Sequence, residues 1–246
     1  MATHKEGDFA SDGYTIVRNA VPHTALAEVR DALTDGLRRI AEPVNGASLD
    51  ELLTRRETEN HDYVYQASNF VGSSIGAYRL IADSGVTGLV EQVTESSNLH
   101  IMPMTVSVQF PSDSRFDYEW HQEGSFYPWA PAVINAWIPL VRPTSRESGT
   151  MFVLPGSHRR GLRPAETYFS HGKFRQIECG VTDEEAATEV PMELDVGDFV
   201  IFDANLVHRS HPNSSQLPRL VCILRYIPMS TLDRVRPLYK ALSYEE

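Results

Sequence analysis

Short β-like runs separated by turn residues recur along the chain from Leu99 onward, and this pattern constrains the fold more than any other feature. Five runs are clear: Met104–Phe110, Val133–Val141, Thr150–Leu154, Asp198–Phe202 and Arg219–Pro228. Turn signals at Pro155-Gly156-Ser157 and Val196-Gly197-Asp198 interrupt the chain between runs. A series of short strands with frequent turns predicts an antiparallel sandwich or barrel.

The first third of the chain has a helical pattern instead. Pro22 precedes a segment from about His23 to Ile40 in which apolar residues recur mostly every three or four positions. A second helix is predicted from about Ala82 to Ser96. Between them, Asp62–Gly76 carries aromatic and amide residues in no clear period, so we predict strand or loop there.

We therefore expect one domain over residues 1–246, of mainly β character with flanking helices, an α+β fold. Residues 1–98 would give a mostly helical support for a β core at 99–230. A polar stretch at about 163–190 lacks a clean period, so we predict an insertion there that acts as a mobile segment or lid.

Charge and composition exclude some classes of function. Acidic residues outnumber basic ones, 33 to 22, and the resulting net charge of -11 argues against nucleic acid as a partner. No run is long and apolar enough to span a membrane, and the first residues are too polar for a signal peptide, so we expect a cytoplasmic protein without a membrane partner. Cys179 and Cys222 are too few for a disulfide framework and are predicted to be buried.

Three side chains suggest a metal site. His121 and Glu123 flank one residue, so on an extended segment both point to the same face. His208 follows an apolar run that a strand would carry into the interior of the same sheet. Two imidazoles and one carboxylate are the ligand set of an open-faced non-haem iron(II) site, which predicts oxygen activation. Such a His-x-Glu pair alone is also common in ordinary cores and surfaces.

The residues after His208 strengthen the metal assignment. Arg219 lies within an apolar run, where an arginine usually needs an anionic partner, and Ser210 supplies a hydroxyl near it. A guanidinium fork and a hydroxyl together predict a receptor for one end of a dicarboxylate. Gln109 and Asn135 lie in predicted strands near the metal motif, and we include both as candidate cofactor-binding residues, with a surface position as the alternative.

At this point the chain resembles a known family, the phytanoyl-CoA dioxygenase family of iron(II)- and 2-oxoglutarate-dependent oxygenases. The resemblance covers about Val106 to Pro228. The motifs that carry it are Trp120-His121-Gln122-Glu123, Ala136-Trp137-Ile138-Pro139-Leu140, the segment from Ser148 to His158, Val196-Gly197-Asp198, and His208 with Ser210 and Arg219.

The resemblance implies a double-stranded β-helix, the cupin-like jelly roll, and it assigns roles. His121, Glu123 and His208 would hold iron(II), Arg219 and Ser210 would bind the distal carboxylate of 2-oxoglutarate, and Trp137 would line the co-substrate pocket. The family usually has aspartate where Glu123 stands. Glutamate keeps the anionic oxygen ligand, so iron binding is expected to survive, and a retained carboxylate argues against a halogenase.

The implied reaction is hydroxylation or another oxidation of an unactivated C-H bond in a small molecule, such as a natural product or sugar-like compound. It would consume O2 and 2-oxoglutarate and release succinate and CO2. We expect a monomer or homodimer. Two alternatives stay open from the residues: a cupin-like metal-binding or isomerase domain without oxygen chemistry, and a zinc hydrolase.

Other segments are candidates for the walls of the pocket. The stretches Ser125–Trp129 and Tyr63–Phe70 are predicted either to line it or to pack in the core. Four arginines are predicted either to form an anion-binding rim or to stand exposed in solvent: Arg142, Arg146, Arg159 and Arg160. His158 is expected to belong to a structural turn.

Overall fold

Seven strands form the larger sheet of the computed structural model, which describes residues 4–170 and 174–232. Its order is β1-β2-β10-β5-β12-β3, and β4 also pairs with β12. All of these pairings are antiparallel. The strands are β1 (Lys5–Glu6), β2 (Tyr14–Val17), β3 (Leu99–Ile101), β4 (Thr105–Gln109), β5 (Ile134–Pro139), β10 (Phe199–Asp203) and β12 (Arg219–Pro228).

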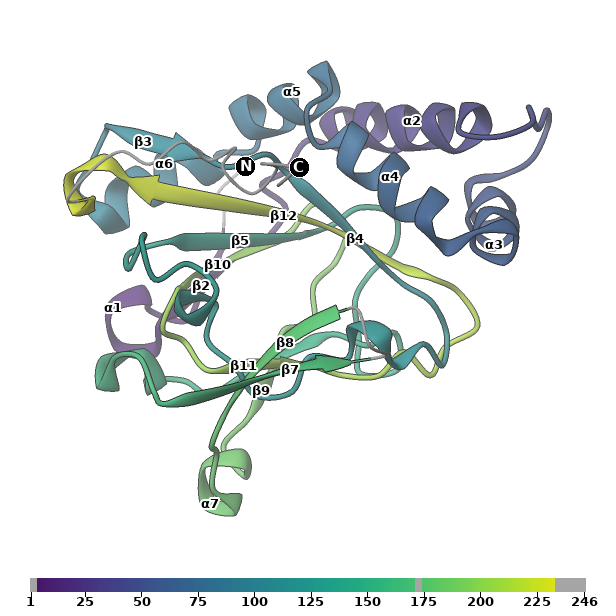
Figure 1. Ribbon diagram of the computed structural model, residues 1–246. Coiled ribbons are helices and arrows are strands. Elements are labelled where there is room, and N and C mark those ends of the chain that lie inside the picture. The colour runs from purple at the N-terminus through teal and green to yellow at the C-terminus, as the bar shows by residue number, and fades with distance from the viewer. Residues whose placement is uncertain (1–3, 171–173, 233–246) are drawn as a thin grey trace, which may run out of the picture.

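A smaller sheet faces the inner side of the larger one (Figure 1). Its antiparallel order is β11-β6-β9. The strands are β6 (Met151–Val153), β9 (Val190–Pro191) and β11 (His208–Ser210). Met151 and Val153 from this sheet share one apolar cluster with Val200 and Val221 from the larger sheet. Two antiparallel sheets packed over a common core form the predicted jelly roll.

Period-two alternation divides the side chains of the larger sheet between two cores. Val200 and Phe202 of β10 pack inward toward the smaller sheet, whereas Phe199 and Ile201 pack outward in the cluster that contains the helices. On β12, Val221 belongs to the inner cluster and its even-numbered neighbours belong to the outer one. Residue parity therefore determines which side chains reach the space between the sheets.

Helices cover the outer face of the larger sheet (Figure 1). They are α2 (His23–Arg39), α3 (Leu49–Glu59), α4 (His61–Val71), α5 (Ile75–Asp83) and α6 (Val86–Thr94). Leu26, Val29, Leu33 and Leu37 recur every three or four positions along α2, and none is more than 2% exposed. The stripe they form is the amphipathic pattern seen in the sequence, and the prediction of a helix at 23–40 is confirmed.

The strand-or-loop prediction for Asp62–Gly76 is wrong, because α4 and the start of α5 occupy this segment. Asn60 caps α4 by accepting a hydrogen bond from the backbone N-H of Asp62 at 3.0 Å. The buried positions Val64, Ala67, Ser68 and Val71 follow a helical spacing that the polar and aromatic residues between them obscured.

The second predicted helix is split. Its expected start at Ala82 lies in α5, and α6 begins only at Val86, after a left-handed Gly85 with a φ of 70°. The first 98 residues are also not only helical, because β1 and β2 extend the larger sheet beside β10 and the short helix α1 (Phe9–Asp12) lies between them.

The predicted strands and turns of the core are present. Each of the five predicted runs contains a strand, and β12 has the predicted bounds, Arg219–Pro228. Gly156 and Gly197 occupy the two predicted turns with φ values of 75° and 105°, which side chains other than glycine rarely adopt. The carbonyl of Gly197 accepts backbone hydrogen bonds from Ala20 and Val21 at 2.8 Å each, so this turn anchors the chain just before α2.

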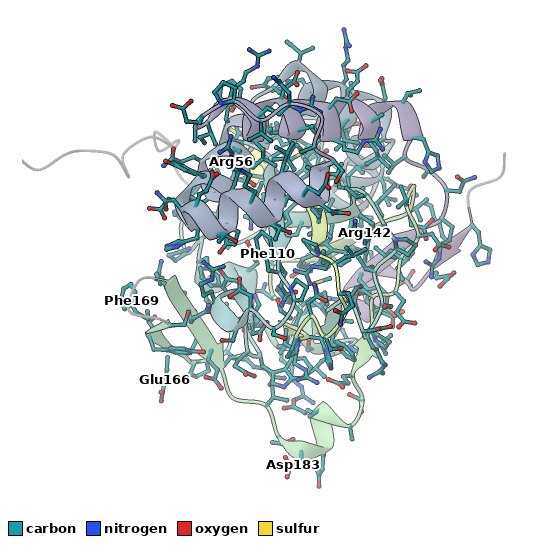
Figure 2. All side chains as sticks on the ribbon, turned by 90° about the vertical axis from the view of Figure 1, so that its right-hand side faces the viewer. Arg56, Phe110, Arg142, Glu166, Phe169 and Asp183 are labelled. Atoms are coloured by element: carbon teal, nitrogen blue, oxygen red, sulfur yellow. The ribbon has the colours of Figure 1, made fainter. Side chains whose placement is uncertain are left out.

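The stretch 163–190 has regular structure. It holds the hairpin of β7 (Ala165–Ser170) with β8 (Phe174–Cys179) and the short helix α7 (Asp183–Ala186). Figure 2 shows Glu166 and Phe169 of β7 at the outer edge of the molecule. That this stretch is an insertion, and that it is mobile, both stay predictions. Residues 171–173 of the stretch lie outside the described residues.

Among residues 4–170 and 174–232, no helix has both the length and the apolar character that crossing a bilayer requires.

Candidate active site

His121 and His208 face each other across an antiparallel bridge, which joins the first residue of β11 to the segment that leads into the 3-10 turn at Glu123. Each backbone N-H donates to the carbonyl of the other residue at 2.9 Å, and the two imidazole centroids lie 4.1 Å apart. A residue pair of this kind, bonded in both directions, fixes both Cα positions. The fold thus joins two residues separated by most of the jelly-roll core in the sequence.

Both imidazoles are oriented by carbonyl groups two residues before them. His121 Nδ1 lies 2.7 Å from the carbonyl oxygen of Glu119, and His208 Nδ1 lies 2.8 Å from that of Leu206. A carbonyl can only accept, so each Nδ1 carries the proton and each Nε2 keeps its lone pair. This tautomer is the one that binds a metal through Nε2.

Glu123 completes the cluster on the same side as His121. Gln122 between them is extended, with φ and ψ of -126° and 132°, and Glu123 starts a single 3-10 turn. Gln122 points the other way, fully buried, and donates to the carbonyls of Gly161 and Asn205 at 2.9 and 2.6 Å. The side chains of His121 and Glu123 therefore lie on the same side of the segment, as predicted. The hydrogen bonds of Gln122 fix the segment from the opposite side.

Burial sets the charge of the three groups. It lowers the pKa of His208 to about 3, with a further lowering from His121, and it lowers the pKa of His121 as well. For Glu123 burial alone would raise the pKa, but opposing effects led by the attraction of the Arg225 guanidinium outweigh it, so the pKa lies below its ordinary value. At neutral pH the cluster is two neutral imidazoles and a carboxylate.

This donor set fits a divalent transition metal. The potential ligand atoms of His121, Glu123 and His208 all lie within 4.8 Å of one another, and the three side chains are buried. Ligand bonds to such an ion are about 2 Å long, so movements on the scale of a rotamer bring all three atoms onto one ion. Two imidazoles and one carboxylate are the ligands of open-faced iron(II) sites, in which further coordination positions stay accessible.

A cavity of about 590 Å³ opens over the cluster, and His121, Glu123 and His208 all line it. The candidate residues Trp137, Ser210 and Arg219 line the same cavity. Its volume is within the range of sites for small molecules. The structure therefore brings together six of the eight residues that the sequence marked as candidates for the site.

Arg219 is buried at the cavity wall with part of its hydrogen-bonding capacity unused. Its Nη1 contacts the carbonyl of Gly149, its Nε has no partner among the described residues, and its guanidinium carbon lies 5.6 Å from the centroid of the Trp137 ring. Burial lowers the pKa of Arg219 to about 10, so it stays charged at neutral pH. A buried cation with a free donor is a receptor for an anion.

The other two candidates lie on the inner face of the sheet but do not line the cavity. Gln109, opposite Arg219 in the β4-β12 ladder, donates to Asp117 Oδ1 at 2.6 Å. Asn135, opposite Arg225 in the β5-β12 ladder, is fully buried, and neither amide atom has a partner among the described residues. Both side chains therefore point toward the inside of the jelly roll, and the sequence alone left this direction open.

Helix α4 forms one wall of the cavity. Tyr65, Ser68 and Asn69 lie on one face of this helix and line the cavity. From the stretch Ser125–Trp129, Phe126 and Tyr127 also line the cavity. Phe126 packs edge-on against the His121 ring, with centroids 5.8 Å apart. Each of the two candidate segments therefore gives some residues to the cavity and others to the core or surface.

The predicted anion-binding rim is not formed. None of the four arginines lines the cavity: Arg142, which is labelled in Figure 2, pairs with Asp50 at 2.7 Å, and Arg160 pairs with Glu185 at 2.7 Å. Arg146 lies over the Phe152 ring, and Arg159 is exposed. His158 belongs to the turn at Gly156, as expected, where its Nε2 lies 3.2 Å from the carbonyl of Ala10.

Sequence reasoning missed Arg225. Its Nε lies 2.7 Å from Glu123 Oε1, and it lines the cavity beside the metal-ligating cluster. The missed signal was spacing: Arg225 stands six positions after Arg219, so both point to the same face of one strand.

A jelly roll with two histidines and one carboxylate converging beside a buried arginine defines a class, the non-haem iron oxygenases. The chain belongs to the phytanoyl-CoA dioxygenase (PhyH) family, whose model matches residues 9–221. This family consists of 2-oxoglutarate-dependent non-haem iron oxygenases, so the protein is an enzyme of that kind. The match favours this assignment over the cupin-like and zinc-hydrolase alternatives.

Individual relatives are distant. The chain is 23% identical to a probable phytanoyl-CoA dioxygenase of Caenorhabditis elegans over 85% of its length and 69% of that protein. It is 26% identical to 1-deoxypentalenic acid 11-beta-hydroxylase of Streptomyces exfoliatus, over 84% of this chain and 73% of that one. EvdO2 from Micromonospora carbonacea var. aurantiaca, solved with 2-oxoglutarate, has a similar fold, with a TM-score of 0.63, 19% identity and coverage of 96% and 98%.

Proposed function

We propose that this enzyme oxidises an unactivated C-H bond of a small polar molecule, with His121, Glu123 and His208 as the iron(II) ligands. The observation that carries the proposal is the shared cavity: the three-residue cluster and the buried Arg219 line one space large enough for a co-substrate and a substrate. Bound iron(II) together with 2-oxoglutarate supplies the oxidising power for such a reaction, which consumes O2 and releases succinate and CO2.

Arg219 and Ser210 are proposed to bind the distal carboxylate of 2-oxoglutarate. The unpartnered Nε of Arg219 gives the guanidinium a donor to offer, and a dicarboxylate satisfies the buried charge. Trp137 lies against that guanidinium. The Gln109-Asp117 pair lies beside Arg219, and the amide of Asn135 lies opposite Arg225 on the same face of the sheet, so we assign both to orienting the co-substrate region from behind the cavity wall.

The remainder of the cavity is proposed to hold the substrate. Its wall mixes aromatic rings with hydroxyl and amide groups, as in Tyr65, Ser68, Asn69, Tyr118 and Tyr127. Such a wall suits a small molecule of mixed polarity, such as a natural product or a sugar-like compound. The S. exfoliatus relative is named as a hydroxylase of 1-deoxypentalenic acid.

We propose that the aromatic side chains around the cluster limit the access of water to it. Phe126 covers one face of His121, and Phe202 packs edge-on against His208 with centroids 4.9 Å apart. A dry, positioned site limits side reactions when no substrate is present.

Succinate release tests the proposal. The purified protein, loaded with iron(II) and 2-oxoglutarate in air, is screened against a library of small metabolites, and hits are checked by mass for added oxygen or lost hydrogen. A hit should raise succinate formation, and a His208→Ala variant should not respond. A product of unchanged mass formed without O2 would favour an isomerase, and hydrolysis supported by zinc alone would favour a hydrolase.

We further propose that the protein works in the cytoplasm as a monomer or homodimer without nucleic acid, in keeping with its net charge of -11. Light scattering after size-exclusion chromatography measures the oligomeric state directly.

A further inference from the structure

Arg225 and Glu123 form an ion pair inside the cavity. Arg225 Nε lies 2.7 Å from Glu123 Oε1, and the two side chains are only 15% and 11% exposed. Arg225 reaches the interior because it shares the inward parity of Val221 and Ile223 on β12. Glu123 reaches it from the 3-10 turn after Gln122. Two segments 102 positions apart are therefore joined at the candidate metal cluster.

Arg225 is itself held in place. Its Nη1 lies 3.3 Å from Thr105 Oγ1 on β4, and its guanidinium carbon lies 5.7 Å from the centroid of the Tyr127 ring. Strand β12 fixes its backbone between β4 and β5. A guanidinium that is anchored on several sides restricts its carboxylate partner to one orientation.

Glutamate needs this restriction more than aspartate does, because it has one additional rotatable bond. With Oε1 accepting a hydrogen bond from Arg225, the other carboxylate oxygen is the one left to face His121 and His208. A metal-ligating carboxylate is commonly oriented in this way by a hydrogen-bond donor outside the ligand set.

We propose that Arg225 is a positioning residue that holds Glu123 as a ligand through a single oxygen and so compensates for its extra methylene. This inference depends on the proposed function only in taking Glu123 as a metal ligand. It assigns a role to a residue whose side-chain hydrogen bonds among the described residues go to Glu123 and Thr105, and not to Arg219 or the two histidines.

Cobalt(II) binding provides a test that does not require the substrate. Cobalt(II) is an optical probe whose visible spectrum reports the geometry of its ligands, and its dissociation constant is measured by titration of the whole protein. Arg225→Gln should weaken cobalt(II) binding by about 10-fold to 100-fold and change the spectrum. Arg225→Lys, which keeps the charge but not the planar fork, should fall between wild type and Arg225→Gln.

Two further variants make the test specific. Arg142→Gln removes a comparable ion pair, to Asp50, outside the cavity and should leave the spectrum and affinity unchanged. In a Glu123→Asp background the shorter ligand no longer depends on Arg225, so Arg225→Gln should cost less there than it does beside glutamate.

The outcomes separate the two proposals. If wild type binds cobalt(II), His208→Ala does not, and Arg225→Gln binds with unchanged affinity and spectrum, the positioning role is wrong and the metal site stands. If His208→Ala binds as tightly as wild type, the metal site itself is wrong. Should Arg225→Gln fail to fold, Arg225→Lys decides: an unchanged spectrum overturns the role, and an altered one supports it.

Discussion

His121 and His208 exchange two backbone hydrogen bonds of 2.9 Å, so the two imidazoles of the candidate iron site are coupled through the main chain as well as through space. Their side chains need little reorganisation to meet one ion, because each ring is already oriented by a carbonyl at its Nδ1. A ligand pair built into a strand bridge is rigid in the absence of metal.

Replacing one histidine tests this convergence. His208→Ala should weaken iron(II) binding at least about 100-fold, because it removes a metal ligand. Loss of a group that only hydrogen-bonds to a ligand usually weakens metal binding by about 10-fold to 100-fold. Isothermal titration with an iron(II) surrogate under anaerobic conditions measures the loss. Far-UV circular dichroism is the control and should match wild type. Equal affinity in the variant and wild type would show that His208 is no ligand.

Arg219→Ala should chiefly weaken 2-oxoglutarate binding. Loss of one partner from a buried, hydrogen-bonded charge pair costs about 2–5 kcal/mol, which corresponds to an increase of roughly 30-fold or more in KM for 2-oxoglutarate. The measurement is succinate formation against 2-oxoglutarate concentration. Arg142→Ala, outside the cavity, is the matched control and should keep the wild-type KM. If Arg219→Ala has the same KM for 2-oxoglutarate as the wild type, the role assigned to Arg219 is wrong.

The Arg163-Glu185 pair gives a prediction about pH. Hydrogen bonds from Arg163 and from the Thr182 backbone lower the pKa of Glu185 from 4.5 to about 2. A folded-state pKa below the unfolded value stabilises the fold above pH 4.5, and this contribution is lost as pH falls toward 2. Glu185→Gln removes the charge and keeps one side-chain oxygen, which can still accept from the Thr182 backbone N-H at the helix cap.

Urea unfolding of wild type and Glu185→Gln across this pH range measures the effect. Wild type should be the more stable protein at pH 7, and the difference in unfolding free energy should shrink below pH 4.5. A difference that stays constant down to pH 3 contradicts the assigned cause.

Both cysteines should be unreactive in the folded enzyme. Burial raises the pKa of Cys222 to about 12, so at pH 8 only about one thiol in ten thousand is the reactive thiolate, and burial also raises the pKa of Cys179. Alkylation followed by mass spectrometry should find both thiols unmodified at pH 8 until urea unfolds the protein. Rapid alkylation of Cys222 under native conditions would place it at an accessible surface.

The jelly-roll strands and the ligand cluster could be predicted because their signals are local. The apolar run Phe199–Phe202 predicts a strand, and the single residue between His121 and Glu123 places both side chains on one side of an extended segment. His208 could be predicted because it directly follows the apolar run that starts at Phe199. In the structure this run contains β10, and His208 begins β11.

The partner of Arg225 and the wall formed by α4 could not be predicted, because both depend on tertiary contacts. Nothing near Arg225 in the sequence identifies Glu123 as its partner 102 positions away. In α4, the buried positions Val64, Ala67 and Val71 alternate with Tyr65, Asn69 and exposed Phe70, so the helical period was hidden by residues that face the cavity or solvent.

An anaerobic optical titration tests the central claim most directly. Iron(II) is added to the protein with 2-oxoglutarate present, and the visible charge-transfer absorption of the joint complex is followed. We predict a band that saturates at one iron per chain in wild type, that is missing in His208→Ala, and that needs more 2-oxoglutarate in Arg219→Ala. A wild-type protein that develops no band, or a band that persists unchanged in His208→Ala, would contradict the account.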